Sequence, residues 1–96
     1  MKLLTILCSS DLAGVVEEVL ERSGAEGFLT VPGAVGVKPS ATPPHGSPPR
    51  WPAHMYVAPV ADAVAVTVLA DLDEFTGRCE EEPCLRIIVT QAEEVR

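Results

Sequence analysis

Two cysteines near the end of the chain, Cys79 and Cys84, are a candidate redox or metal-binding pair. Four residues separate them, and three of these form an acidic run at residues 80–82. A pair at this spacing could close a small disulfide that acts as a redox switch, or it could offer two thiolates to a soft metal ion. A structural zinc site usually combines two close Cys or His pairs, and the intervening carboxylates disfavour the thiolate form. Redox switch, metal site and plain surface turn therefore all stay open.

A proline-rich segment, residues 32–52, contains seven of the nine prolines of the chain. Proline has no amide donor and interrupts strand pairing, so the sequence predicts one long loop here. No acid occurs between Glu26 and Asp62. Lys38 and Arg50 give that part a charge of +2 against −9 for the rest, which sum to −7. We expect the loop to order on a ligand or partner and to bring its two bases to an anionic group. A solvated insertion without a partner is the alternative.

Four side chains of this loop are candidates for contact with a partner protein: Lys38, His45, Arg50 and Trp51. Tryptophan and arginine are enriched at binding hot spots, so Trp51 beside Arg50 could be an exposed anchor. Packing over the edge of the sheet is the equally open alternative. His45 and the nearby His54 could in principle complete a metal site with the cysteines. The sequence has no Ser-His-Asp ordering and no metalloprotease motif, which predicts a protein that is not an enzyme and has no catalytic residues.

Length and charge narrow the class of protein. Ninety-six residues suit a single domain, residues 1–96 with a flexible loop at about 32–53, whose small core would gain from assembly with further copies. The net charge of −7 argues against nucleic-acid binding, which needs Lys and Arg to displace counterions from phosphate. No apolar stretch approaches the about 20 residues of a membrane-spanning helix. Three cysteines fit a reducing compartment, and bulky Leu7 before Cys8 departs from a lipoprotein signal, so we expect a cytoplasmic protein.

The first elements follow from hydrophobic spacing. The apolar run at residues 3–8 predicts a buried strand with Cys8 as a core residue. Residues 9–11 then offer side-chain oxygens that could cap the first turn of a helix. The helix has an apolar face opposite its Glu and Arg side chains, and Gly24 is a suitable C′ residue after it. The apolar face consists of Leu12, Val15, Val16, Val19 and Leu20.

The later elements are shorter, and one of them is ambiguous. Residues 27–31, 54–58 and 85–90 are typical of short strands, and the tail that follows is polar. Residues 60–75 contain β-branched side chains in near-alternation, which favours a strand. Apolar residues also recur at helical spacing through this segment, so periodicity leaves strand and helix nearly even.

Five short segments occur in an order and at spacings typical of one family. They are residues 1–6 followed by 9–12, residues 24–28, the loop 32–52, the triplet 76–78 that sixteen residues separate from Pro59, and residues 87–89 followed by 93–95. Together they resemble the PII-like signalling superfamily, the GlnB/GlnK-related proteins, over nearly the whole chain. The resemblance implies an α+β, ferredoxin-like βαββαβ fold, with the long loop as the T-loop between the second and third strands. It therefore favours a helix over residues 60–75.

The resemblance also implies a homotrimer that binds a small anionic effector in clefts between its subunits. The effector would be an adenine nucleotide (ADP, ATP or AMP) or bicarbonate, and the T-loop would act on a membrane transporter or a metabolic enzyme. The acidic run at residues 80–82 stands where the family has glycines and a lysine against phosphate, which predicts a divergent member. The positions that match the family's ligand-binding residues are Gly36, Val37, Lys38, Thr76, Gly77, Arg78 and Arg86.

A second function stays open on the same fold. The chain could be a metal- or redox-responsive protein that resembles the trimeric divalent-cation-tolerance proteins and uses Cys79 and Cys84. Titration with adenine nucleotides, bicarbonate and divalent metals would separate the two functions.

Overall fold

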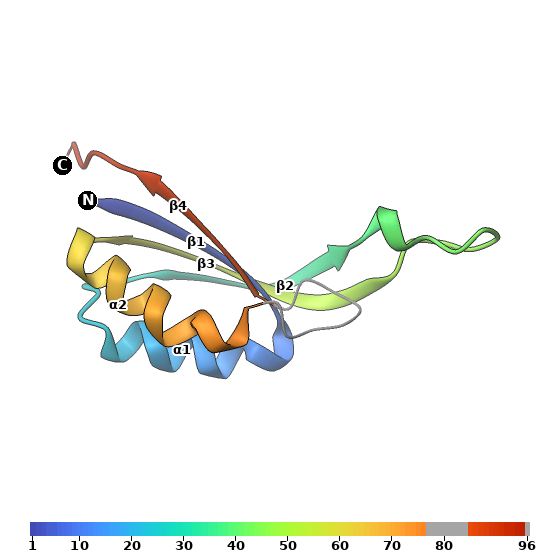
Figure 1. Ribbon diagram of the computed structural model, residues 1–96, viewed down its shortest axis with the longest axis horizontal. Coiled ribbons are helices and arrows are strands. Elements are labelled where there is room, and N and C mark those ends of the chain that lie inside the picture. Colours follow the sequence, from blue (N-terminus) through green and yellow to red (C-terminus); the bar gives the residue numbers. More distant parts are fainter. Residues whose placement is uncertain (77–84, 96) are drawn as a thin grey trace.

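The described part of the chain forms a four-stranded antiparallel sheet with two helices, in the order βαββαβ. A computed structural model describes residues 1–76 and 85–95 (Figure 1). The strands lie in the order β2-β3-β1-β4, and each pairs antiparallel with its neighbours. This is the ferredoxin-like arrangement that the sequence predicts. The elements are β1 Lys2–Ser9, α1 Ala13–Arg22, β2 Leu29–Val37, β3 Arg50–Val60, α2 Asp62–Leu72 and β4 Leu85–Gln91, with short 3₁₀ turns at Ser10–Leu12, Pro39–Ala41 and Asp73–Phe75.

The ambiguous segment after β3 is helical, as the resemblance favours. α2 buries Ala65, Val68 and Leu72 against the sheet, and these three residues lie on one helical face. Burial of that face outweighs the modest preference of valine for strands. The helix is shorter than expected, since Val60 still belongs to β3 and Asp62 is the first helical residue.

The predicted loop over residues 32–52 is wrong at both ends, because β2 continues to Val37 and β3 begins at Arg50. Only residues 38–49 connect the two strands. Pro32 is tolerated because β2 is an edge strand and its pairing shifts register between Val31 and Ala34, where a missing amide donor costs little. Gly33 makes this bulge with a φ of 73°, a left-handed conformation that favours glycine.

Proline at the start of β3 is tolerated for a related reason. Pro52 pairs with Val35 of β2, but the last pair that β3 forms with β1 is Ala53 with Ser9. At Pro52 the sheet therefore has only two strands, and this residue has one partner strand instead of two. The two strands continue beyond the helices as a ribbon that ends in the loop (Figure 1).

The helices cover one face of the sheet, and the core lies between the helices and this face (Figure 1). Leu4, Ile6 and Tyr56 of the sheet are fully buried there, together with Val16 and Leu20 of α1. Cys8 also lies in this core and is 2% exposed, which confirms its predicted place. We call this the covered face.

The ends of α1 agree only in part with the sequence. Gly24 has a φ of 93° directly after the helix, as expected of a C′ glycine. The predicted N-terminal cap is wrong, because no side chain caps the 3₁₀ turn or α1. Ser9 remains paired in β1, and the Ser10 hydroxyl lies 3.0 Å from Nδ1 of His54 instead.

The opposite face of the sheet, which we call the open face, has no helix against it among the residues described (Figure 1). Strand alternation places aliphatic side chains on this face too. Leu7 is 36% exposed, Ile88 49% and Leu29 68%. No helix in residues 1–76 or 85–95 is long and apolar enough to cross a membrane.

Candidate functional site

Two cavities lie at opposite ends of the open face. One is lined by residues from the end of β1, the end of β2 and the starts of β3 and β4, next to the loop. The other is lined by residues from the start of β1, the start of β2 and the end of β3. We call them the loop-base cavity and the acidic cavity.

The loop-base cavity gathers several of the predicted ligand-binding residues. It has a volume of about 320 Å³, and Gly36, Val37 and Arg86 all line it. Arg86 reaches it from β4, where it pairs with Leu7 of β1. Lys38 follows Val37 directly, and its amide donates to the carbonyl of Pro49 at 3.2 Å, which closes the base of the loop.

Lys38 and Thr76, the other predicted ligand-binding residues that the structure describes, do not line this cavity. Thr76 follows the 3₁₀ turn after α2, and its hydroxyl donates to the carbonyl of Asp73 at 2.7 Å. Gly77 and Arg78 lie outside the described residues, as do Cys79 and Cys84, so their predicted roles stay predictions.

Trp51 also lines the loop-base cavity, but it is not the exposed anchor that one interpretation expects. It is 8% exposed and pairs with Gly36 across β3 and β2. Its indole lies over the glycine so closely that a Cβ at position 36 would overlap ring atoms Cε2, Nε1 and Cζ2. The packed alternative therefore holds, since the absent side chain at Gly36 leaves room for the ring.

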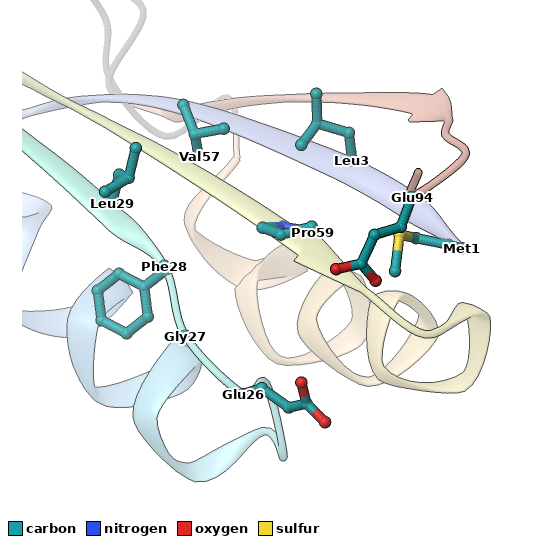
Figure 2. Close-up of a pocket in the computed structure, with 9 residues that line it drawn as sticks. All are labelled: Met1, Leu3, Glu26, Gly27, Phe28, Leu29, Val57, Pro59 and Glu94. Carbon is teal, nitrogen blue, oxygen red and sulfur yellow. The ribbon is translucent and has the colours of Figure 1, made fainter. Parts of the chain in front are cut away.

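The acidic cavity is larger, about 550 Å³, and sequence reasoning missed it. Its walls are mainly apolar and include Phe28, Leu29 and Pro59, with the carboxylates of Glu26 and Glu94 beside them. Figure 2 shows that the two acids come from distant segments, one from the connection between α1 and β2 and the other from the stretch after β4. The only signal in the sequence was an isolated acid beside an apolar strand start.

The two histidines lie in different elements of the chain. His45 is exposed in the loop, whereas His54 lies in β3 and stacks on Tyr56 with ring centroids 6.1 Å apart. In the part of the chain that the structure describes, no group of three or more His, Cys, Asp or Glu side chains could hold a metal ion. The hypothesis of a metal site that includes Cys79 and Cys84 stays a prediction, because both cysteines lie outside the described residues.

The buried cysteine is not a reactive thiol. Burial raises the pKa of Cys8 to about 11, and the nearby carboxylates of Asp11 and Glu17 act in the same direction, against a hydrogen bond from the His54 backbone. The thiol therefore stays protonated near neutral pH and lacks the nucleophilicity of a thiolate.

Comparison with known proteins identifies the fold. No family model matches the sequence, and no curated protein matches it. The PII-like protein CPII from Thiomonas intermedia K12, in its complex with ADP and bicarbonate, has a TM-score of 0.66 at 19% identity, covering 93% of this chain and 82% of CPII. A PII-like signalling protein from Thermus thermophilus has a TM-score of 0.57 at 22% identity, with coverages of 93% and 82%.

A protein of the alternative functional class has the same fold. The divalent cation tolerance protein from Thermus thermophilus has a TM-score of 0.67 at 13% identity, covering 100% of this chain and 88% of that protein. The chain thus has the fold of PII-like proteins, as the resemblance implied. Because both classes share this fold, the choice between their functions depends on the side chains of the site.

Proposed function

We propose that the protein is a PII-like regulator that binds an adenine nucleotide, or bicarbonate, in clefts between the subunits of a homotrimer. The observation that carries the proposal is the open face of the sheet, with an apolar centre and two unlike cavities at its ends. In this proposal the protein is cytoplasmic and non-enzymatic, and the loop at residues 38–49 acts on a transporter or an enzyme.

Assembly follows from the exposure of the open face. Large aliphatic side chains such as Leu29 and Ile88 are half-exposed or more in a single chain. Contiguous apolar surface of this kind usually marks an interface, and a chain of 96 residues has a small core of its own. A cyclic trimer would place each open face against its neighbours and cover these side chains.

The two cavities suit the two ends of one nucleotide. Arg86 lines the loop-base cavity, and Lys38 and Arg50 flank its wall, so phosphate oxygens or bicarbonate would find cations there. The acidic cavity would repel phosphate, but its apolar walls suit a flat base, and Glu26 or Glu94 could accept hydrogen bonds from an amino group. In a cyclic assembly the loop-base cavity of one subunit would meet the acidic cavity of the next.

The loop is the proposed contact with a partner protein. It extends away from the sheet at the end that carries the loop-base cavity (Figure 1). Lys38 and His45 are the ionisable side chains that it offers, and Arg50 is exposed at the start of β3. A ligand bound at the loop base would thus lie beside the segment that meets the partner. CPII, which has this fold, was crystallised with ADP and bicarbonate, and this supports the choice of effectors.

Calorimetric titration of the whole protein with ADP, ATP, AMP and bicarbonate, with light scattering on the same samples, tests the proposal. We expect a trimer that binds at least one of these ligands, and an Arg86→Ala variant that binds it about tenfold more weakly. Arg22→Ala is the matched control, since Arg22 lies on α1 and pairs with Glu18 at 3.2 Å. A monomer, or a protein that binds none of the four ligands, would overturn the proposal.

The second candidate is a metal- or redox-responsive protein, supported by the fold shared with the divalent cation tolerance protein. The same titration with Zn²⁺ and Cu²⁺ distinguishes it. Metal binding that a Cys79→Ser/Cys84→Ser variant loses, without any nucleotide binding, would favour this candidate over the first.

A further inference from the structure

The contact between Trp51 and Gly36 lies where the sheet narrows to two strands. β1 ends with the pair between Ser9 and Ala53, so beyond that point β3 pairs only with β2. A tryptophan in a two-stranded ribbon is normally well exposed, yet this one is 8% exposed. Within the described part of the chain, the ribbon itself and the end of β1 both lie beside the indole.

Gly36 lies on one side of the indole. A Cβ on this residue would stand closer to the indole atoms Cε2, Nε1 and Cζ2 than the 3.0 Å that real Cβ atoms keep. The backbone of β2 thus lies directly against the ring. On the side of β1, Trp51 and Ser9 line the same small hollow, and Ser9 is 2% exposed.

The backbone that the indole holds is also the wall of the loop-base cavity. Gly36, Val37 and Trp51 all line that cavity. One residue further, the amide of Lys38 donates to the carbonyl of Pro49 and joins the two ends of the loop. A shift of the ring would therefore move the cavity wall and the loop base together, because Lys38 directly follows Gly36 and Val37, the last residues of β2.

We propose that Trp51 is a positioning residue that holds residues 36–38 against the loop-base cavity and thereby sets both the affinity for the effector and the order of the loop. The effect on effector affinity rests on the proposed function, whereas the effect on the order of the loop does not. It assigns to Trp51 a role within the subunit, distinct from the partner contact that the sequence suggested.

A double-mutant cycle tests this role, with Gly36→Ala, Trp51→Leu and the two together. Gly36→Ala adds a methyl group where the ring lies, and Trp51→Leu removes the ring that the methyl group would meet. If the contact positions the segment, the two changes compensate, and the double variant is closer to the parent than Gly36→Ala is. Gly14→Ala is the control, because a Cβ on Gly14 meets nothing within 4 Å.

Two measurements on the full chain follow the cavity and the loop separately. Calorimetry with ADP follows the cavity, and we expect about a tenfold loss of affinity in Gly36→Ala with partial recovery in the double variant. Hydrogen exchange of residues 38–49 without ligand follows the loop, and we expect faster exchange in Gly36→Ala, with the same recovery. Circular dichroism checks that each variant is folded.

The outcomes separate this inference from the proposed function. If the parent binds no ADP but the exchange of the loop shows the compensation, the effector is wrong and the positioning role stands. If the parent binds ADP while Gly36→Ala binds equally well and exchanges equally slowly, the positioning role is overturned. Additive effects of the two substitutions would overturn it as well. Additivity would mean that Gly36 and Trp51 act independently, whereas a positioning contact couples them.

Discussion

The covered and open faces of the sheet are built from the same kinds of side chain but differ in what lies against them. Leu4 and Ile6 point to the helices and are fully buried, whereas Leu7 in the same strand is 36% exposed. Aliphatic content therefore does not tell which face of this sheet is the core. The difference shows that the helices cover the apolar side chains of one face only, and that aliphatic side chains of the other face stay exposed in a single chain, as is typical of an interface.

The largest expected effect is on the covered face. Leu20→Ala removes a fully buried side chain between α1 and the sheet. We expect the free energy of unfolding to fall by about 2–5 kcal/mol, a large part of the stability of a small domain. Urea denaturation followed by circular dichroism measures it. Val66→Ala is the control, because Val66 is 67% exposed on α2 and its truncation should cost less than about 0.5 kcal/mol. Equal losses in the two variants would show that the helices do not cover the core as described.

A substitution on the open face should change the assembly of the protein and leave the fold of each chain intact. Ile88→Lys places a charge on the open face midway along the edge strand β4, where Ile88 pairs with Thr5 and is 49% exposed. In the proposed trimer this charge would be buried without a partner, which is costly, so we expect the assembly to dissociate into monomers that keep their helix content. Light scattering and circular dichroism on the same samples measure the two effects. A variant that remains trimeric would remove the open face from the interface.

The sequence predicted the order of the elements well, because that order depends on local periodicity and on motif spacing. The spacing of apolar residues predicted both the buried face of α1 and the strand β1. The spacing of apolar residues did not predict α2, because the outer face of this helix also carries apolar side chains, with Val66 and Leu69 exposed. A helix that is apolar on all sides has no clear period, and only the spacing of the surrounding motifs favoured the correct assignment.

The site was less predictable, because its geometry depends on pairing between distant strands. Proline counting placed a loop over the whole of residues 32–52, whereas an edge strand with a bulge accommodates Pro32. The packed position of Trp51 depends on its register with Gly36, which no local pattern reveals. The acidic cavity is lined by both Glu26 and Glu94, which lie at opposite ends of the chain in two of the family-like segments, residues 24–28 and 93–95; the spacing of those segments does not reveal that the two acids line one cavity.

Two titratable groups of the covered face should make the fold sensitive to alkali. Burial raises the pKa of Cys8 from 9.0 to about 11 and that of Tyr56 from 10.0 to about 12. The folded state keeps these protons to higher pH than the unfolded state, so the stabilisation is complete below pH 9 and declines as pH rises to 11 and then 12. Each group contributes a slope of about 1.4 kcal/mol per pH unit between its two pKa values.

Urea denaturation at pH 8, 9, 10 and 11 measures this slope. We expect Cys8→Ala to flatten the part between pH 9 and 11 and to leave the part due to Tyr56. The comparison uses slopes, so a constant loss from the smaller side chain does not affect it. An unchanged slope in Cys8→Ala would mean that the thiol titrates normally and is not held in the core.

The smallest expected effect concerns Ser9, which, like Trp51, is buried although strand alternation places it on the open face. Alternation along β1 places it on the open face with Leu7, yet it is 2% exposed, beside Trp51. Its hydroxyl oxygen is buried and has no hydrogen-bond partner within residues 1–76 and 85–95. A buried hydroxyl without a partner costs stability, because it has lost its bonds to water. We therefore expect Ser9→Ala to raise the free energy of unfolding by up to about 1 kcal/mol, in contrast to the usual loss from truncating a buried residue. Urea denaturation measures this change. Ser23→Ala is the control, because the Ser23 hydroxyl donates to the carbonyl of Leu20 at 2.8 Å and its removal should lower the free energy of unfolding. A loss of stability in Ser9→Ala would show that this hydroxyl does have a partner in solution, such as a bound water, and that the hollow beside Trp51 is hydrated.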